Sequence, residues 1–238
     1  MSTKALALLL ALAGCDALPG NQTGAKPAET SSSRFPKADR PVAPITSSRW
    51  STEEARDRVR EAERVMAMAG VTPGMTVADI GAGEGYYTVR LAAQVGKKGR
   101  VVAQDVVPEV RDKLAERVLR EQLDNVSVKL GGPADPKLPE NSFDRVFLVH
   151  MYHEIAQPLE FLWRLWPALR AGGRVIIVDA ERKTTDHGTP IKLLECELKA
   201  AGYRKVEHRP LPQNAVYFAA FEREAARPEP EAIKPCKG

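Results

Sequence analysis

Residues 77–87 read Val77-Ala78-Asp79-Ile80-Gly81-Ala82-Gly83-Glu84-Gly85-Tyr86-Tyr87. An apolar, β-forming run leads into three glycines at alternate positions, and a helical pattern of apolar residues follows from Thr88 to Val95. This order predicts a strand, a tight turn and a helix. Glycines in such a turn can adopt a positive φ and leave the backbone bare, so a ligand can lie against it. The helix then directs its unpaired N–H groups at that ligand.

The spacing of these glycines distinguishes two classes of ligand. A dinucleotide-binding turn, Gly-x-Gly-x-x-Gly, would place its third glycine at position 86, where the chain has Tyr86. The spacing present, Asp-x-Gly-x-Gly-x-Gly, resembles motif I of the class I S-adenosylmethionine (SAM)-dependent methyltransferases. The resemblance implies that Asp79 helps to hold the ammonium group of SAM. It implies that four further residues back the amino-acid moiety of SAM: Gly81, Ala82, Gly83 and Gly85. A purely structural glycine turn is the alternative.

The rest of the chain alternates between strand and helix patterns. Strands are predicted after the first one at 100–105, 126–130, 145–149 and 174–178, and helices at 52–69, 108–122, 158–169 and 190–201. A closing pair of strand-like runs, 203–208 and 215–221, resembles the antiparallel hairpin of the methyltransferase sheet. We therefore expect an α/β fold: a doubly wound, Rossmann-like seven-stranded sheet, mostly parallel, with an antiparallel last strand.

The N-terminal part has a different composition from this domain. Residues 5–13 are wholly apolar. The run leads into Leu12-Ala13-Gly14-Cys15, which resembles the lipobox of bacterial lipoproteins. The resemblance implies a signal peptide at 1–14, lipidation of Cys15 and a membrane anchor; an apolar N-terminal helix is the alternative. Residues 15–48 are rich in Pro, Ser, Thr, Ala and Gly and predict a flexible tether. The methyltransferase domain is expected at 49–223 and a disordered tail at 224–238.

Charge and composition limit the classes of partner. The net charge is +4, and the basic residues are interspersed with acidic ones instead of forming one block. We therefore expect no nucleic-acid partner. The family resemblance described below implies a small-molecule substrate, and we expect a monomer. Beyond Cys15 the chain has two cysteines, Cys196 and Cys236, which can pair in an oxidising compartment.

Acidic residues that follow the predicted strands are the candidate cofactor ligands. Asp105 ends the second strand, where a carboxylate can accept hydrogen bonds from both ribose hydroxyls; a helix cap is the alternative. The segment 131–144 resembles the family's link between strands three and four, in which an acidic residue contacts the adenine amino group. We assign that contact to Asp135, with Ala134 beside it, although Gly132 occupies the usual position of the acid.

The sequence His150-Met151-Tyr152-His153-Glu154 follows the fourth predicted strand. It resembles a variant found in small-molecule methyltransferases of this class, which implies that His150 lies near the sulfonium. His153 or Glu154 can act as general base toward an acceptor hydroxyl, amine or thiol. A structural hydrogen bond from His153 is the alternative. No further ligand pattern is visible, so we expect no metal site.

These observations favour a membrane-anchored, SAM-dependent methyltransferase on the periplasmic side, acting on a small molecule. SAM is made in the cytoplasm, however, and an exported enzyme would lack a ready supply. The alternatives are an exported, non-catalytic methyltransferase-like domain that binds a small ligand, and a cytoplasmic protein whose translation begins later.

Overall fold

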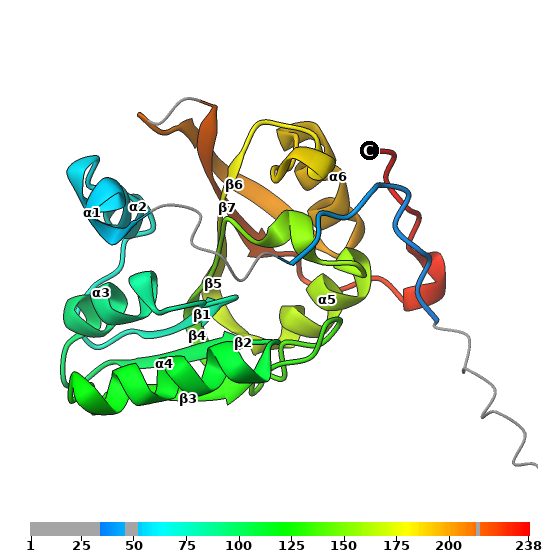
Figure 1. Ribbon diagram of the computed structural model, residues 1–238. Coiled ribbons are helices and arrows are strands. Elements are labelled where there is room, and N and C mark those ends of the chain that lie inside the picture. Colours follow the sequence, from blue (N-terminus) through cyan, green and yellow to red (C-terminus); the bar gives the residue numbers. More distant parts are fainter. Residues whose placement is uncertain (1–33, 46–51, 213–214) are drawn as a thin grey trace, which may run out of the picture. The chain divides into compact units, whose positions relative to one another are not determined.

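A seven-stranded β-sheet organises the protein, for which we describe a computed structural model (Figure 1). The structure describes residues 34–45, 52–212 and 215–238, so the expected signal peptide and Cys15 lie outside it. The strands lie in the order β3-β2-β1-β4-β5-β7-β6. Their bounds are β1 Thr76–Ile80, β2 Arg100–Asp105, β3 Val126–Leu130, β4 Phe143–Val149, β5 Leu169–Ala180, β6 Tyr203–Pro210 and β7 Val216–Arg223.

Strands β1 to β5 pair in parallel, whereas β7 pairs antiparallel with both β5 and β6. The predicted doubly wound sheet with an antiparallel last strand is therefore confirmed. The chain progresses from β1 through β2 to β3 in one direction and then returns to β4 on the other side of β1. Strand order thus reverses between β1 and β4, and in such sheets a ligand binds beyond the carboxyl ends of the strands at this reversal.

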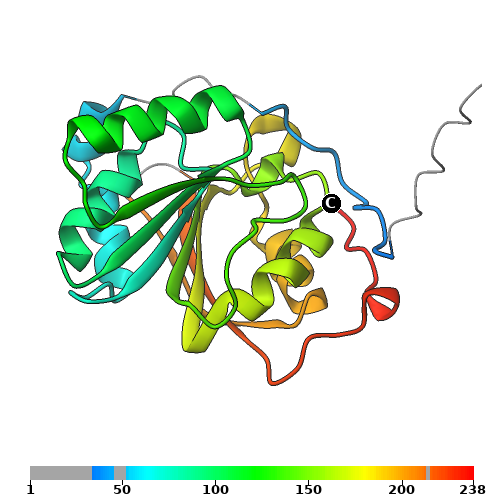
Figure 2. The ribbon, with the colours of Figure 1, turned by 90° about the horizontal axis from the view of Figure 1, so that it is seen from below.

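Helices cover both faces of the sheet (Figures 1 and 2). The α-helices are α1 Glu53–Arg58, α2 Glu61–Met68, α3 Tyr86–Val95, α4 Pro108–Arg120, α5 Pro158–Leu165 and α6 Ile191–Ala200. Helices α2 and α3 pack on the face that carries Val77 and Phe147, while α5 and α6 pack on the face that carries Ala78 and Leu148. Both faces are buried because neighbouring residues of one strand point to opposite sides.

The helix expected at 52–69 is divided in two. Arg60 adopts a left-handed conformation with φ 53° between α1 and α2. Thr52 is the N-cap of α1, and its Oγ1 accepts a hydrogen bond from the N–H of Ala55 at 3.2 Å. The break reorients the second segment, in which the carboxylate of Glu61 is buried and bonded to Arg56. Apolar spacing alone does not reveal such a break, since both halves keep the helical period.

The helix expected at 158–169 also ends early. Helix α5 stops at Leu165 and continues as a 3₁₀ turn, Trp166–Ala168, because Pro167 has no N–H to extend the α-helical pattern. Strand β5 begins before the predicted 174–178, and it includes Gly172 and Gly173 at an irregularity of its pairing with β4.

Two segments expected to be flexible are packed in the structure. Residues 34–45, within the predicted tether, and residues 224–238, the predicted disordered tail, run beside each other, and the N–H of Gly238 bonds to the carbonyl of Asp39 at 3.0 Å. Phe35 and Ile233 bury against Leu159. A disulfide joins Cys236 to Cys196 on α6. A few apolar anchors and one cross-link offset the ordering entropy of segments whose average composition is that of a linker.

Among the residues that the structure describes, no helix combines the length and the apolar character that crossing a bilayer requires.

Loss of the disulfide should destabilise the fold. It closes a separation of 40 residues, and a cross-link of this kind stabilises a protein by about 3 kcal/mol, chiefly by restricting the unfolded chain. We expect Cys196→Ser to lower the free energy of unfolding in urea by about that amount. Reductant should lower the stability of the wild type to that of the variant and leave the variant unchanged. Equal stability of the wild type and Cys196→Ser without reductant would contradict the disulfide.

Candidate active site

A cavity of about 550 Å³ lies beyond the carboxyl ends of β1, β2 and β4, where strand order reverses. Its wall is formed by the glycine turn 80–84, the end of β2 at 104–107, Gly132 and Pro133, and two stretches after β4, 149–151 and 154–156. Ile45, Glu53 and Arg56 line it from the N-terminal side, and the helices that follow the strands add Tyr86, Glu109, Val110, Lys113 and Phe161. The volume lies within the range of small-molecule sites.

The glycine turn presents bare backbone to this cavity. Gly81 has φ +64°, and a Cβ there would lie 2.9 Å from Cγ of Met151. Gly83 has φ +55° and nothing within 4 Å of the position of a Cβ, so it opens onto free space. Of the four residues predicted to back SAM, Gly81, Ala82 and Gly83 line the cavity and Gly85 does not. A Cβ on Gly85 would lie 2.6 Å from Leu114 of α4, so this glycine permits close packing of α3 against α4.

Asp105 connects the end of β2 to the glycine turn. Its side chain is buried at 7% exposure, Oδ2 accepts a hydrogen bond from the N–H of Gly83 at 3.0 Å, and Oδ1 accepts one from the N–H of Val107 at 3.0 Å. An ionised carboxylate has about four acceptor sites, so it can also accept hydrogen bonds from a ligand in the cavity. This position is compatible with the ribose contact predicted for Asp105. Asp105 also accepts hydrogen bonds from backbone N–H groups of two turns, which is the structural role given as the alternative.

Asp79, predicted to help hold the ammonium group of SAM, lies beside the glycine turn without lining the cavity. Its carboxylate is 3% exposed, accepts a hydrogen bond from Thr88 Oγ1 at 2.6 Å and lies behind the turn, outside the cavity wall. Burial, with a smaller contribution from the nearby charge of Asp105, raises the pKa of Asp79 to about 6. Asp79 thus fixes the first turn of α3, and the structure does not place it in direct reach of a ligand.

Asp135 and Ala134, predicted to lie at the adenine, do not line the cavity in the structure. Asp135 Oδ1 accepts a hydrogen bond from the N–H of Lys137 at 2.8 Å. Its side chain is 41% exposed and faces Arg164. The segment bends at Gly132, so the acid closes a turn of its own loop while Gly132 and Pro133 line the cavity.

Sequence reasoning missed Gln104, which lies in the cavity wall beside Asp105. Its side chain is fully buried, and neither the amide nitrogen nor the oxygen has a hydrogen-bond partner among the described residues. It occupies the space over Gly131, where a Cβ would collide with its Nε2. An unpartnered buried amide is costly, so a polar ligand that bonded to it would remove that cost.

His150 lines the cavity as expected and has φ +54°. Its Nε2 lies 3.5 Å from Oε2 of Glu61, and Glu61 also accepts from Arg56 at 2.5 Å and from the hydroxyl of Tyr87 at 3.2 Å. Burial alone would raise the pKa of Glu61, but His150 and Arg56 lower it to about 2. No spacing in the sequence links Glu61 to His150, because the contact joins α2 to the loop after β4.

Arg56 and Tyr86 form the opposite part of the wall. The Arg56 guanidinium lies over the Tyr86 ring at 3.9 Å from its centre, a cation–π arrangement that holds an arginine at the cavity. Glu53 lines the same part of the cavity and bonds to Arg117 at 2.5 Å. The sequence marked Arg56 and Glu53 only as helix residues.

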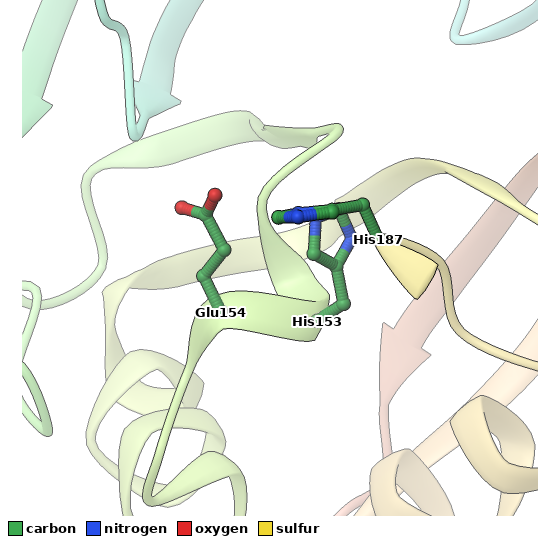
Figure 3. Close-up of side chains that lie close together, drawn as sticks. All are labelled: His153, Glu154 and His187. Carbon is green, nitrogen blue, oxygen red and sulfur yellow. The ribbon is translucent and has the colours of Figure 1, made fainter. Parts of the chain in front are cut away.

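The two predicted catalytic residues separate in the structure. Both lie on the 3₁₀ turn η1, Tyr152–Glu154, and Figure 3 shows them beside His187. Glu154 lines the cavity, whereas His153 is 1% exposed and lies outside its wall. Nδ1 of His153 lies 3.0 and 3.1 Å from the two carboxylate oxygens of Asp179 on β5. Direct general-base action of His153 in this cavity is therefore not supported, and its alternative, a structural hydrogen bond, is present.

Comparisons with known proteins agree with this geometry. A family described as a methyltransferase domain matches residues 77–173. The chain is 33% identical over 116 residues to the arsenite methyltransferase of Halobacterium salinarum, covering 48% of this chain and 29% of that protein. It is 41% identical over 86 residues to the nocamycin O-methyltransferase of Saccharothrix syringae, covering 36% and 30%. The chain thus matches less than a third of the length of these two relatives.

A solved structure extends the likeness to the fold. A SAM-dependent methyltransferase from Aquifex aeolicus superposes with a TM-score of 0.65 at 27% identity, over 70% of this chain and 92% of that one. The protein therefore has the class I methyltransferase fold, residues 77–173 match a methyltransferase domain, and this fold and family match imply SAM as the cofactor. The bare turn, Asp105 and the unpartnered Gln104 fit such a polar ligand.

Replacing Asp79 should change how stability depends on pH. Its folded pKa of about 6 exceeds the ordinary value of 3.8, so the folded state favours the protonated carboxyl. The associated stability is fully present below about pH 4 and is lost as pH rises through 6, a loss of up to about 3 kcal/mol by pH 8. We expect the Asp79→Asn variant to lack this loss in chemical unfolding from pH 4 to 8. If stability fell equally with pH in the wild type and in the variant, the raised pKa of Asp79 would be contradicted.

Proposed function

We propose that this protein is a SAM-dependent methyltransferase that methylates a small molecule. The observation that carries the proposal is the contact of the Asp105 carboxylate with the N–H of Gly83 at the point where strand order reverses. It places an acceptor for ribose hydroxyls next to bare backbone in a single cavity. The matched methyltransferase domain spans all of these residues.

Methyl transfer demands little covalent chemistry from the protein. SAM held by the glycine turn and Asp105 would supply a methyl group that its sulfonium already activates, so the residues of the chain have to bind and orient the reactants and let the acceptor lose its proton. Holding donor and acceptor in line can supply about 7–11 kcal/mol of the barrier reduction. Of the two predicted catalytic residues, Glu154 lines the cavity, so we place Glu154 at the acceptor end of the site.

The size of the cavity and the relatives support a small acceptor. A space of about 550 Å³ lies within the size range of small-molecule sites. The names of the two relatives specify arsenite and nocamycin as their acceptors. An acceptor of small-molecule size is the property that these two substrates share.

We also propose that the chain is lipidated on Cys15 and anchored on the periplasmic side of a membrane. The lipobox-like Leu12-Ala13-Gly14-Cys15 supports the anchor. The disulfide between Cys196 and Cys236 supports an oxidising compartment, since such bonds are rare in the cytosol. How SAM reaches the protein there is a question that cofactor binding and localisation must answer together.

Calorimetric titration with SAM and with its demethylated product tests the enzyme proposal. We expect binding of both, and Asp105→Ala should weaken SAM affinity by about 2 kcal/mol, roughly 30-fold, because the ribose loses charge-assisted hydrogen bonds. Asp135→Asn is the matched control: it keeps an acceptor for the N–H of Lys137, and Asp135 lies outside the cavity, so its SAM affinity should equal that of the wild type.

Each failure of this titration has a distinct meaning. A folded wild type that binds neither compound would remove the enzyme proposal in favour of a domain for another ligand. An Asp105→Ala variant with unchanged affinity would reject the ribose contact alone. A large loss in Asp135→Asn would restore the adenine contact that the structure does not place there.

Lipidation is tested by replacing Cys15 in a bacterium that processes lipoproteins. We expect the wild type in the membrane fraction, with a mass increase from the lipid, and Cys15→Ser in the soluble fraction with its N-terminal segment uncleaved. Cys196→Ser is the control, because it removes a thiol that takes part in the disulfide and should stay with the membranes. A Cys15→Ser protein that is still cleaved and membrane-bound would refute the anchor.

A further inference from the structure

Three side chains that can bind a metal ion converge beside the cavity. His153 and Glu154 come from η1, and His187 comes from the loop between β5 and α6 (Figure 3). One ligand atom of each side chain lies within 4.8 Å of the ligand atoms of the other two. The rings of His153 and His187 meet edge to face, with centres 5.4 Å apart.

Asp179 fixes the tautomer of His153 that has a lone pair available for a metal ion. Its carboxylate accepts hydrogen bonds from the N–H of Ala180 at 2.8 Å and from the hydroxyl of Thr189 at 2.7 Å, and it lies 3.0 Å from Nδ1 of His153. Because a carboxylate with two such donors acts as an acceptor, Nδ1 of His153 carries the proton. The lone pair of the neutral ring is then on Nε2. Metal-binding histidines are typically held by a carboxylate in this way.

The loop that carries His187 is fixed in position. His187 ends the 3₁₀ turn Thr184–Asp186 with φ +54°, and a Cβ on the following Gly188 would lie 2.5 Å from the carbonyl oxygen of Ala180. The N–H of Thr189 bonds to that same carbonyl at 2.9 Å. The second histidine is therefore held against the end of β5, next to Asp179.

We propose that His153, His187 and Glu154 bind a divalent first-row transition-metal ion at the edge of the cavity. Two imidazoles and one carboxylate suit zinc, cobalt or iron, and three protein ligands leave coordination positions open, as in catalytic sites. Ligand atoms about 2.0–2.2 Å from one tetrahedral ion are ~3.4 Å apart, so from separations of up to 4.8 Å each pair of ligand atoms has to approach by at most ~1.4 Å, which side-chain rotation can supply. Glu154 lines the cavity, so the ion would lie beside the space proposed for the acceptor.

Metal binding can be measured without SAM, so its failure is distinct from failure of the proposed methyltransferase. The untagged full-length protein is stripped with a chelator, dialysed and titrated with Zn²⁺ by calorimetry and with Co²⁺ by visible absorption. We expect one equivalent of either ion. We also expect the visible bands of bound Co²⁺ to change when azide is added, because azide occupies an open coordination position. No binding, or bands that azide does not change, would overturn the proposal.

Variants assign the ligands. His187→Ala and Glu154→Gln should each weaken binding roughly 100-fold or more, since each removes one of three ligands. Asp179→Asn should weaken it roughly 10-fold by loosening the hold on His153. His208→Ala is the matched control, because it removes an exposed histidine of β6 and should bind as the wild type does. Wild-type affinity in both His187→Ala and Glu154→Gln would refute the site, and metal-free thermal unfolding of each variant establishes that it is folded.

Discussion

The carboxylate of Asp105 is the constraint on which the candidate site depends. It accepts the N–H of Gly83 from the turn after β1 and the N–H of Val107 from the start of the segment after β2. One buried anion therefore fixes two neighbouring strand ends in relation to each other, and the cavity wall consists of these ends and of the loop after β4. Without this link the glycine turn would have no bond to β2 through a side chain.

The buried carboxylates around the turn differ in their electrostatic state because their partners differ. Asp79 has a hydroxyl partner and the repulsion of Asp105, so burial prevails and its pKa rises to about 6. Glu61, equally buried, has Arg56 and His150, and its pKa falls to about 2. A cationic group bound near the turn would offset the repulsion between Asp79 and Asp105. The fold thus keeps two carboxylates that repel each other beside the cavity, and a cationic group of the ligand can reduce this repulsion.

The sequence predicted the features that depend on local pattern and missed those that depend on contacts between distant segments. The strands followed from buried apolar runs, and the turn followed from alternate glycines whose φ only glycine adopts readily. The role of Asp135 could not be predicted, because the direction of its side chain depends on how the loop bends at Gly132. His187 could not be linked to His153 either, since they meet only after β5 returns to the sheet beside β4.

The N-terminal segment 34–45 extends this dependence on distant contacts to the turn η1. Arg40, from the segment expected to be a tether, is buried and forms an ion pair with Glu197 of α6 at 2.9 Å. Its guanidinium also donates to the carbonyls of Tyr152, His153 and Ile155, the backbone that carries Glu154. Burial of the Arg40 charge without these acceptors would cost much free energy. The guanidinium therefore stays at Glu197 and the three carbonyls, and it fixes the backbone that carries them. The domain therefore includes residues 34–45, because the position of Glu154 relies on a residue that composition alone assigns to a linker.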